Sequence, residues 1–271
     1  MQESYEFEPS KIQEAIDEVF LSLKDKESKI SSTVYKCAFR SYLFSFISFS
    51  FSFKTLLEKK CYDTVQHICR GALERYAIVK RYLENFLDDS KLTIITQKLV
   101  IDEMDSDISD YYNIKSDKTI LDIEQKSSDM KSMLSRVIFL MEKFFPEEYK
   151  GFHLLDEILL DKKIFVVSQL IKSLQQKYDS QFEDMNIWNT FIRNTLKNNM
   201  AYKNEYGKEV DGAGFTYSIL SEASHPNFYH IDHRINYNNL VSVNRRMHND
   251  DVAALILYWC LKDIALEIKK I

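Results

Sequence analysis

Three side chains near the C-terminal end of the chain have types and a spacing that suit chemistry. Tyr217, Ser221 and His225 follow one another at intervals of four residues in "YSILSEASHP". If residues 214–225 form a helix that Pro226 ends, the three side chains lie on one face of it. His225 could then act as a general acid or base, with the two hydroxyl groups as hydrogen-bond donors.

A second pair lies in the helical pattern of residues 62–88. Arg70 and Glu74, in "ICRGALERYAIVKRYL", fall on the polar side of this pattern, opposite a broad apolar arc. The pair has two interpretations. It is either an ordinary exposed ion pair, which contributes about 0 to 1 kcal/mol, or half of a site in which Arg70 and Glu74 face His225 across a cleft.

Three interpretations of the histidine segment stay open. His225, His230 and His233 follow the spacing H-x4-H-x2-H, which matches neither H-E-x-x-H nor a zinc-finger pattern. Ser221 and His225 could form a nucleophile and base pair, but no G-x-S-x-G turn accompanies them. The plainest alternative is that these two side chains satisfy each other or the backbone at a helix end. Neither a metal nor a cofactor is expected.

The two segments together resemble a family of bacterial all-α proteins with an R-x-x-x-E helix and a later Y-x-x-x-S-x-x-x-H-P segment. The positions that match are Arg70, Glu74, Tyr217, Ser221, His225 and Pro226. The family also looks like the HEPN group of helical proteins, many of which are metal-independent ribonucleases of toxin and antiviral systems. In HEPN proteins a histidine follows the arginine on the same helix, whereas Glu74 follows Arg70 here. The resemblance implies a HEPN-like core, a site at the matching residues and a homodimer.

Three functions follow as hypotheses. The first is a ribonuclease effector of a bacterial defence or toxin system, in which His225 transfers a proton and Arg70 holds the phosphate. The second is a noncatalytic helical interaction or sensor protein of such a system, in which the same residues form a buried polar network. The third is a nucleotide or small-molecule pocket. The expected partners are accordingly RNA or a protein of the same system.

Composition favours a helical protein outside the membrane. The 271 residues are 45% hydrophobic and include only 5 Gly and 3 Pro, which is too few for the turns of a β-sandwich or for phosphate-binding loops. A net charge of −5 excludes a protein that coats nucleic acid nonspecifically. The apolar runs 41–53 and 252–261 are shorter than the roughly 20 residues of a membrane span. The four cysteines lack C-x-x-C spacing, which favours buried free thiols in a reducing cytoplasm.

The hydrophobic periodicity predicts a single all-α domain over 1–271, a bundle of about eight or nine helices. Run 41–53 is expected to be helix rather than strand. The first helix should begin at Pro9 and Ser10, with a capping box between Ser10 and Gln13, and should bury Phe20. Polar composition predicts mobile loops near 103–118 and 203–214. Further helices are expected at 31–59, 62–88, 90–102, 116–145, 154–178, 183–202 and 250–271.

Overall fold

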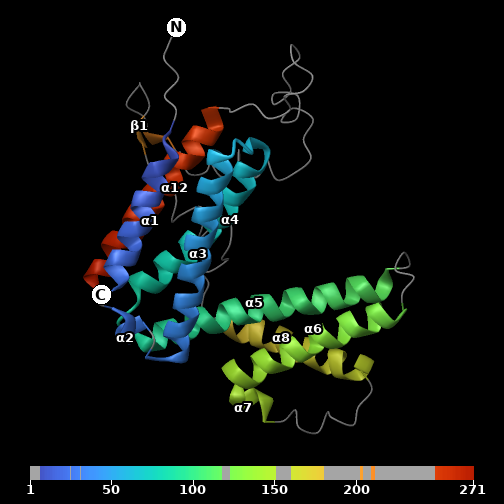
Figure 1. The fold of residues 1–271 in the computed structure, drawn as a ribbon. Coiled ribbons are helices and arrows are strands. Elements are labelled where there is room, and N and C mark those ends of the chain that lie inside the picture. The colour runs from blue at the N-terminus through green and yellow to red at the C-terminus, as the bar shows by residue number, and fades with distance from the viewer. Residues whose placement is uncertain are drawn as a thin grey trace, which may run out of the picture. The chain divides into compact units, whose positions relative to one another are not determined.

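The described part of the chain is a helical protein, as the sequence predicts (Figure 1). The computed structural model describes residues 7–24, 26–30, 32–117, 123–150, 160–179, 202–203, 209–210 and 248–271. Within these ranges lie nine helices and two strands of two residues each. The all-α class is therefore confirmed.

The contacts of the chain form two compact units. One unit joins Met1–Asp89 to Met185–Ile271, and the other is Ser90–Asp184. This division groups contacts only, so the single folding domain expected over 1–271 stays a prediction.

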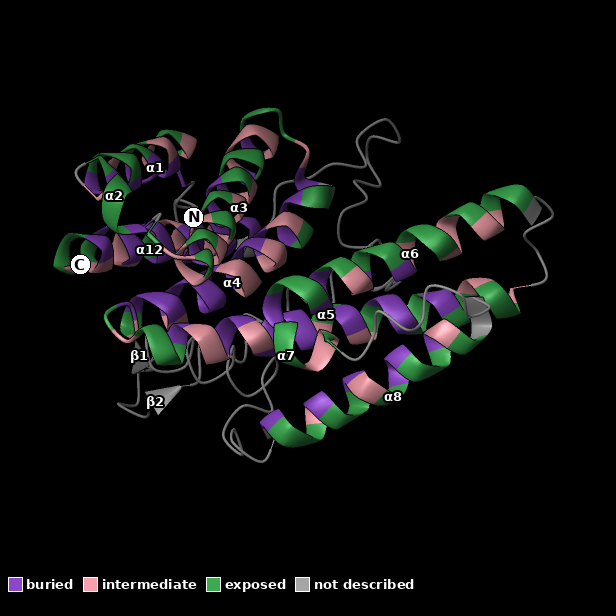
Figure 2. Ribbon diagram, turned by 90° about the horizontal axis from the view of Figure 1, so that it is seen from below, coloured by how far each residue is buried: buried purple, intermediate pink, exposed green. Residues whose placement is uncertain are grey.

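The first unit is built from five helices and a small sheet. The helices are α1 (Pro9–Leu23), α2 (Glu27–Ile30), α3 (Val34–Glu58), α4 (Tyr62–Glu84) and α12 (His248–Lys270). Helix α3 packs along α4, and α1 packs along α12, which also contacts α4 (Figure 1). Buried residues occur along both α4 and α12 (Figure 2). The strands β1 (Tyr202–Lys203) and β2 (Glu209–Val210) pair antiparallel, with Tyr202 opposite Val210.

Helix α3 settles the ambiguity of the phenylalanine-rich run in favour of a helix. Its buried positions recur every three or four residues, which is the helical period: Phe39, Leu43, Phe46, Ile47, Ser50, Phe53 and Leu57. Serines on the helix donate to carbonyls one turn earlier, as Ser50 does to Phe46 at 2.9 Å. The side chain of Thr33 accepts from the Lys36 amide and caps the N-terminus.

Helix α1 begins at Pro9, as expected, but not through the predicted capping box. Glu8 occupies the cap position and its side chain makes no capping bond, while the Gln13 amide donates to Asp17 at 2.9 Å. The buried face also differs from the prediction, because Phe20 is 45% exposed. The buried residues of α1 are Ile12, Ala15, Ile16, Val19, Ser22 and Leu23, so Phe20 lies outside the buried face.

The N-terminal and C-terminal helices of this unit are joined by polar contacts as well as apolar ones. The Phe7 amide donates to Asp251 at 2.8 Å, and Glu18 pairs with both Lys262 and Lys269. Hydrogen bonds from Lys262 and Lys269 hold the pKa of the Glu18 carboxyl below its ordinary value. The carboxylate is therefore charged at neutral pH and helps to hold α1 along α12.

The second unit consists of α5 (Asp89–Ser116), α6 (Ile123–Phe144), α7 (Pro146–Tyr149) and α8 (Leu160–Asp179). A chain of hydrogen bonds joins three of its elements: the Gln97 amide donates to the Phe144 carbonyl at 3.1 Å, and the Tyr178 hydroxyl donates to Gln97 at 2.7 Å. Arg136 on α6 forms an ion pair with Asp107 on α5, whose side chain is only 3% exposed. These polar contacts link α5 to α6 and α5 to α8.

The mobile loop predicted near 103–118 is instead helical as far as Ser116. Met104, Ile108 and Tyr111 recur at helical spacing and are buried, which stabilises the helix although the residues between them are acidic. Apart from β1 and β2, the predicted loop at 203–214 and the predicted helix at 183–202 lie outside the described residues. No helix in the described ranges is both long enough and apolar enough to cross a membrane.

Candidate functional site

Arg70 and Glu74 lie where the sequence places them, on the polar side of α4. The Arg70 Nε donates to Glu74 Oε1 at 3.2 Å, and the two side chains are 28% and 30% exposed. His67, one turn earlier, is exposed. The polar stripe of α4 is therefore partly open to solvent at these residues.

The structure does not describe the other half of the predicted site, the segment that contains His225. Tyr217, Ser221, His225 and the adjacent Pro226 lie outside the described residues. The convergence of Arg70 with His225 stays a prediction. What the structure gives is an i,i+4 ion pair in partial contact with water, which is the geometry of the ordinary ion pair.

A second polar cluster, absent from the sequence prediction, lies between α4 and α12. Lys80 on α4 donates to both carboxylate oxygens of Asp263, at 3.0 and 2.8 Å, and to Glu267 at 2.9 Å. The Tyr76 hydroxyl donates to Asp263 at 2.9 Å. The Lys80 side chain is only 8% exposed. We call Tyr76, Lys80, Asp263 and Glu267 the Lys80 cluster.

The electrostatics of the Lys80 cluster suit packing rather than proton transfer. Burial raises the pKa of the Tyr76 phenol, and the nearby Cys260 and Asp263 raise it further, so the phenol stays protonated and acts as a donor. Burial alone would lower the pKa of Lys80, but the hydrogen bonds to Asp263 and Glu267 outweigh it and the net direction is upward. The upward shift in the pKa keeps the Lys80 amine charged, so neither Tyr76 nor Lys80 is set to exchange a proton near neutral pH.

Two more hydrogen-bonded pairs link α4 to α12, and with the Lys80 cluster we call them the polar seam. The Gln66 amide donates to Asp250 at 2.9 Å, and the Cys69 thiol lies 3.6 Å from the Ala253 carbonyl. The last helix, which the sequence predicts from Asp250, begins two residues earlier at His248. Because each pair links one residue of α4 to one of α12, a slip of either helix by one turn would break all of them.

The seam has a weak signal in the sequence. Gln66, Cys69, Tyr76 and Lys80 are three, seven and four residues apart, which is the spacing of one helix stripe. The ammonium group of a lysine at the edge of an apolar stripe is normally expected to face solvent, because its long stem can reach water. Only the position of Asp263 and Glu267 on α12 reveals that Lys80 turns inward instead.

Next to Arg70, a glycine allows α3 to approach α4 closely. A Cβ atom on Gly71 would lie 2.5 Å from Phe49 Cε1 on α3. The Arg75 guanidinium lies over the Phe49 ring, with its Cζ 3.9 Å from the ring centroid, and its Nε donates to Ser45 Oγ at 2.7 Å. The glycine in "CRGALER" therefore serves helix packing.

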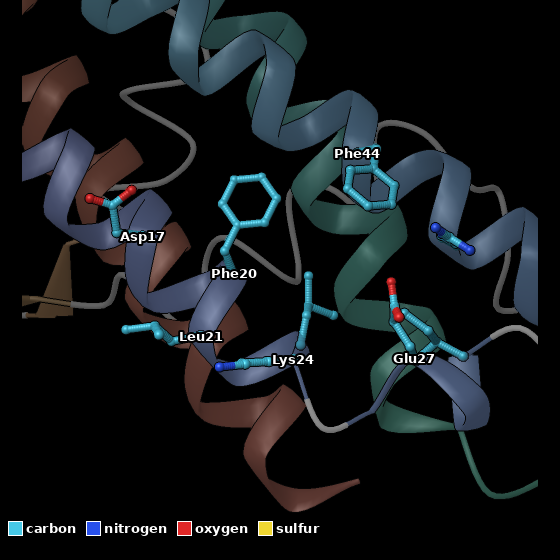
Figure 3. Close-up of a pocket in the computed structure, with 9 residues that line it drawn as sticks. Asp17, Phe20, Leu21, Lys24, Glu27 and Phe44 are labelled. Atoms are coloured by element: carbon cyan, nitrogen blue, oxygen red, sulfur yellow. The ribbon is translucent and has the colours of Figure 1, made fainter.

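An apolar hollow of about 650 Å³ opens between α1, α2 and α3 (Figure 3). Phe20 on α1 and Phe44 on α3 stand on opposite sides of it, with ring centroids 6.5 Å apart. The Arg40 guanidinium carbon lies 5.4 Å from the centroid of the Phe44 ring. The nine residues that line the hollow are Asp17, Phe20, Leu21, Leu23, Lys24, Glu27, Ile30, Arg40 and Phe44. The sequence prediction missed it because Phe20 fits the core stripe of α1.

The cysteines correct one expectation and leave another as predicted. All four are free thiols, but only Cys69 and Cys260 are buried; Cys61 is half-buried and Cys37 is exposed. Burial raises the pKa of the Cys69 and Cys260 thiols well above the ordinary value. These two side chains are therefore packing residues. Across the described ranges, no three His, Cys, Asp or Glu side chains are grouped as a metal would require.

A scan against protein-family models, a search of curated proteins and a search of solved structures give no match to this chain. The function must therefore be argued from the residues and their geometry.

Proposed function

We propose that this chain is a noncatalytic helical interaction protein, and that it serves a bacterial defence or toxin system in the cytoplasm. The observation that carries the proposal is the Lys80 cluster. Among the described residues, Tyr76 and Lys80 of α4 bind the acidic side chains of α12 in this cluster, with Lys80 8% exposed and Tyr76 1% exposed. Such an arrangement fixes the alignment of two helices and gives a partner a rigid surface.

The accessible features of the same unit support binding over catalysis. General acid–base catalysis needs a titratable group of suitable pKa within reach of a substrate. The phenol of Tyr76 is buried and stays protonated, whereas the hollow beside α1 is accessible and mainly apolar. Exposed apolar surface bordered by charged residues is typical of protein interaction sites.

The proposal is tested by looking for RNA cleavage and for the effect of Arg70 on stability. The purified full chain is incubated with labelled single-stranded and hairpin RNA in EDTA, beside His225→Ala and Arg70→Ala. We expect the three proteins to leave the RNA as intact as buffer does. Arg70→Ala should lower the free energy of unfolding by no more than about 1 kcal/mol, the value of a partly exposed ion pair. Cleavage that His225→Ala abolishes while the circular dichroism spectrum is unchanged would contradict the proposal.

A second candidate is the HEPN-like metal-independent ribonuclease, favoured by the solvent-accessible side chains of Arg70 and Glu74 on one stripe of α4. In this candidate His225 is the acid or base, Arg70 holds the phosphate, Glu74 orients one of them, and Tyr217 and Ser221 donate hydrogen bonds. This candidate requires RNA cleavage that persists in EDTA and that His225→Ala and Arg70→Ala each abolish. A nucleotide pocket would instead raise the melting temperature on addition of a nucleotide, and Arg70→Ala would remove the rise.

A further inference from the structure

The hollow between α1, α2 and α3 has the size and the lining of a small-molecule site. Its volume of about 650 Å³ lies within the roughly 300 to 1,000 Å³ that is usual for ligand pockets in proteins. At roughly 30 Å³ for each water-sized group, this hollow admits a molecule of no more than about 20 non-hydrogen atoms. Five of its nine lining residues are apolar and four are charged. Ligand pockets share this composition, in which an apolar lining binds the body of the ligand and a few polar groups orient it.

The apolar lining consists of buried residues and two exposed rings. Leu23 and Ile30 are 6% and 2% exposed, and we call them the floor of the hollow. Phe20 on α1 and Phe44 on α3 stand on opposite sides and are 45% and 40% exposed (Figure 3). We call these two rings the walls. An apolar molecule in the hollow would cover the floor and remove both rings from water, which favours binding.

The four charged residues of the lining carry no net charge, but they are unequally placed. Asp17 and Lys24 are exposed, and Figure 3 shows that both side chains are directed away from Phe44. The Glu27 carboxylate points toward Phe44 in the same view. The guanidinium carbon of Arg40, which is half-buried, lies 5.4 Å from the centroid of the Phe44 ring. One acid and one base therefore lie beside the same wall of the hollow.

An acid and a base at one wall favour a particular head group. A carboxylate only accepts hydrogen bonds and a guanidinium only donates them, whereas an amide offers both a donor and an acceptor. An amide can therefore bind Glu27 and Arg40 together. A ligand that ends in a carboxylate would bring a like charge to Glu27, and one that ends in an ammonium group would bring a like charge to Arg40. The wall thus favours an amide over either ion.

We propose that the hollow binds a small amide of no net charge, with an apolar body. The body lies against the floor and the two walls, the amide N–H donates to Glu27, and the amide oxygen accepts from Arg40. A fatty-acid amide belongs to this chemical class. The inference goes beyond the proposed function, which the Lys80 cluster carries. Amide binding can therefore fail while the RNA test of the proposed function succeeds, and the reverse also holds.

Titration of the full chain with three related compounds tests the head group. Octanamide, octanoate and octylammonium share one hydrocarbon chain length and differ in charge. Saturation-transfer nuclear magnetic resonance should give octanamide a dissociation constant of about 1 mM or lower, from the burial of its chain. Octanoate and octylammonium should each bind at least about fivefold more weakly, because each sets a like charge against one side chain of the wall.

Removal of one aromatic ring tests the location. Phe44→Ala should weaken octanamide binding about tenfold, because one wall is lost. The matched control is Phe51→Ala. Phe51 lies on the same helix, is 49% exposed and has the Lys54 ammonium 5.2 Å from its ring centroid, but it does not line the hollow. This control should bind octanamide as the wild type does.

Neutralising one charge at a time tests the roles of Glu27 and Arg40. In Glu27→Gln, octanoate should bind within about twofold of octanamide, because the repelling carboxylate is gone. In Arg40→Gln, octylammonium should do so for the corresponding reason. Because Glu27 is exposed, Glu27→Gln tests the site even if Phe44→Ala does not fold. Circular dichroism checks the fold of each variant.

The inference is overturned if octanamide does not bind at about 5 mM, or if either ion binds the wild type as tightly as octanamide does. Equal octanamide binding by Phe44→Ala and Phe51→Ala, or a preference for octanamide that neither charge variant changes, would overturn it as well. A final compound is N-acetylleucinamide, which offers peptide amides beside a leucine side chain. Tighter binding of this compound than of octanamide would make the hollow a site for a peptide segment of another protein and would also overturn the inference.

Discussion

Replacing Lys80 by methionine removes the ammonium group from the Lys80 cluster and keeps most of the apolar stem. The change deletes hydrogen bonds of 2.8 and 3.0 Å to Asp263 and of 2.9 Å to Glu267. Both carboxylates then face each other on successive turns of α12 without the charge that separates them. We expect α4 and α12 to separate more readily, and the free energy of unfolding to fall.

The size of the loss follows from the exposure of the three groups. Breaking an exposed pair costs about 0 to 1 kcal/mol, and removing one partner of a fully buried pair costs about 3 to 5 kcal/mol. The Lys80 side chain is 8% exposed, whereas Asp263 and Glu267 are 30% and 22% exposed. Water can therefore partly hydrate the two carboxylates that remain, and we expect a loss of about 2 to 3 kcal/mol.

Urea denaturation followed by far-ultraviolet circular dichroism measures this loss. The matched control is Lys150→Met, because the Lys150 Nζ lies 2.7 Å from both carboxylate oxygens of Glu147 but the two side chains are 69% and 76% exposed. The control should change the free energy of unfolding by less than about 0.5 kcal/mol. Equal losses for the two variants would refute the reasoning, since burial would then not decide the strength of the pair.

Three further outcomes are expected. Gly71→Ala should lower the free energy of unfolding by about 1 kcal/mol in urea denaturation, because crowding against Phe49 exceeds the gain in helix propensity; with Phe49→Ala present, the same change should stabilise. The hydrogen bond from Lys80 lowers the pKa of Glu267 below its ordinary 4.5, so the free energy of unfolding should fall as the pH drops below that value. In Glu267→Gln it should fall less steeply, and denaturation at several pH values measures both slopes. Cys69 and Cys260 should resist a thiol reagent until the chain is unfolded, while the other two cysteines react, since burial raises the pKa of both thiols; four fast thiols would contradict this.

The helical class could be predicted from the sequence because it depends on local properties. Scarce glycine and proline, and apolar residues at helical spacing, favour helices wherever the chain then packs. The phenylalanine-rich run of α3 became a helix as expected, since its buried positions recur every three or four residues. The acidic second half of α5 was assigned to a loop because composition outweighed the period of Met104, Ile108 and Tyr111, which tertiary burial then stabilised.

The candidate site could be predicted only in part. Arg70 and Glu74 share one face of α4, as a helical period predicts, whereas their role in a site stays a prediction. The Lys80 cluster was not found, since it depends on contacts between residues more than 180 positions apart that no local pattern contains. The exposure of Phe20 was missed for the same reason, because it depends on how α2 and α3 meet α1.

The packing of α12 on α1 and α4 affects how this protein folds during translation. Helices α1, α3 and α4 are synthesised long before α12, yet α12 covers apolar faces of both α1 and α4. During translation those faces stay uncovered while the whole of the intervening unit is made, and that unit is contiguous in the chain. A nascent chain of this kind is exposed to aggregation, and binding by a chaperone would shield it until synthesis is complete.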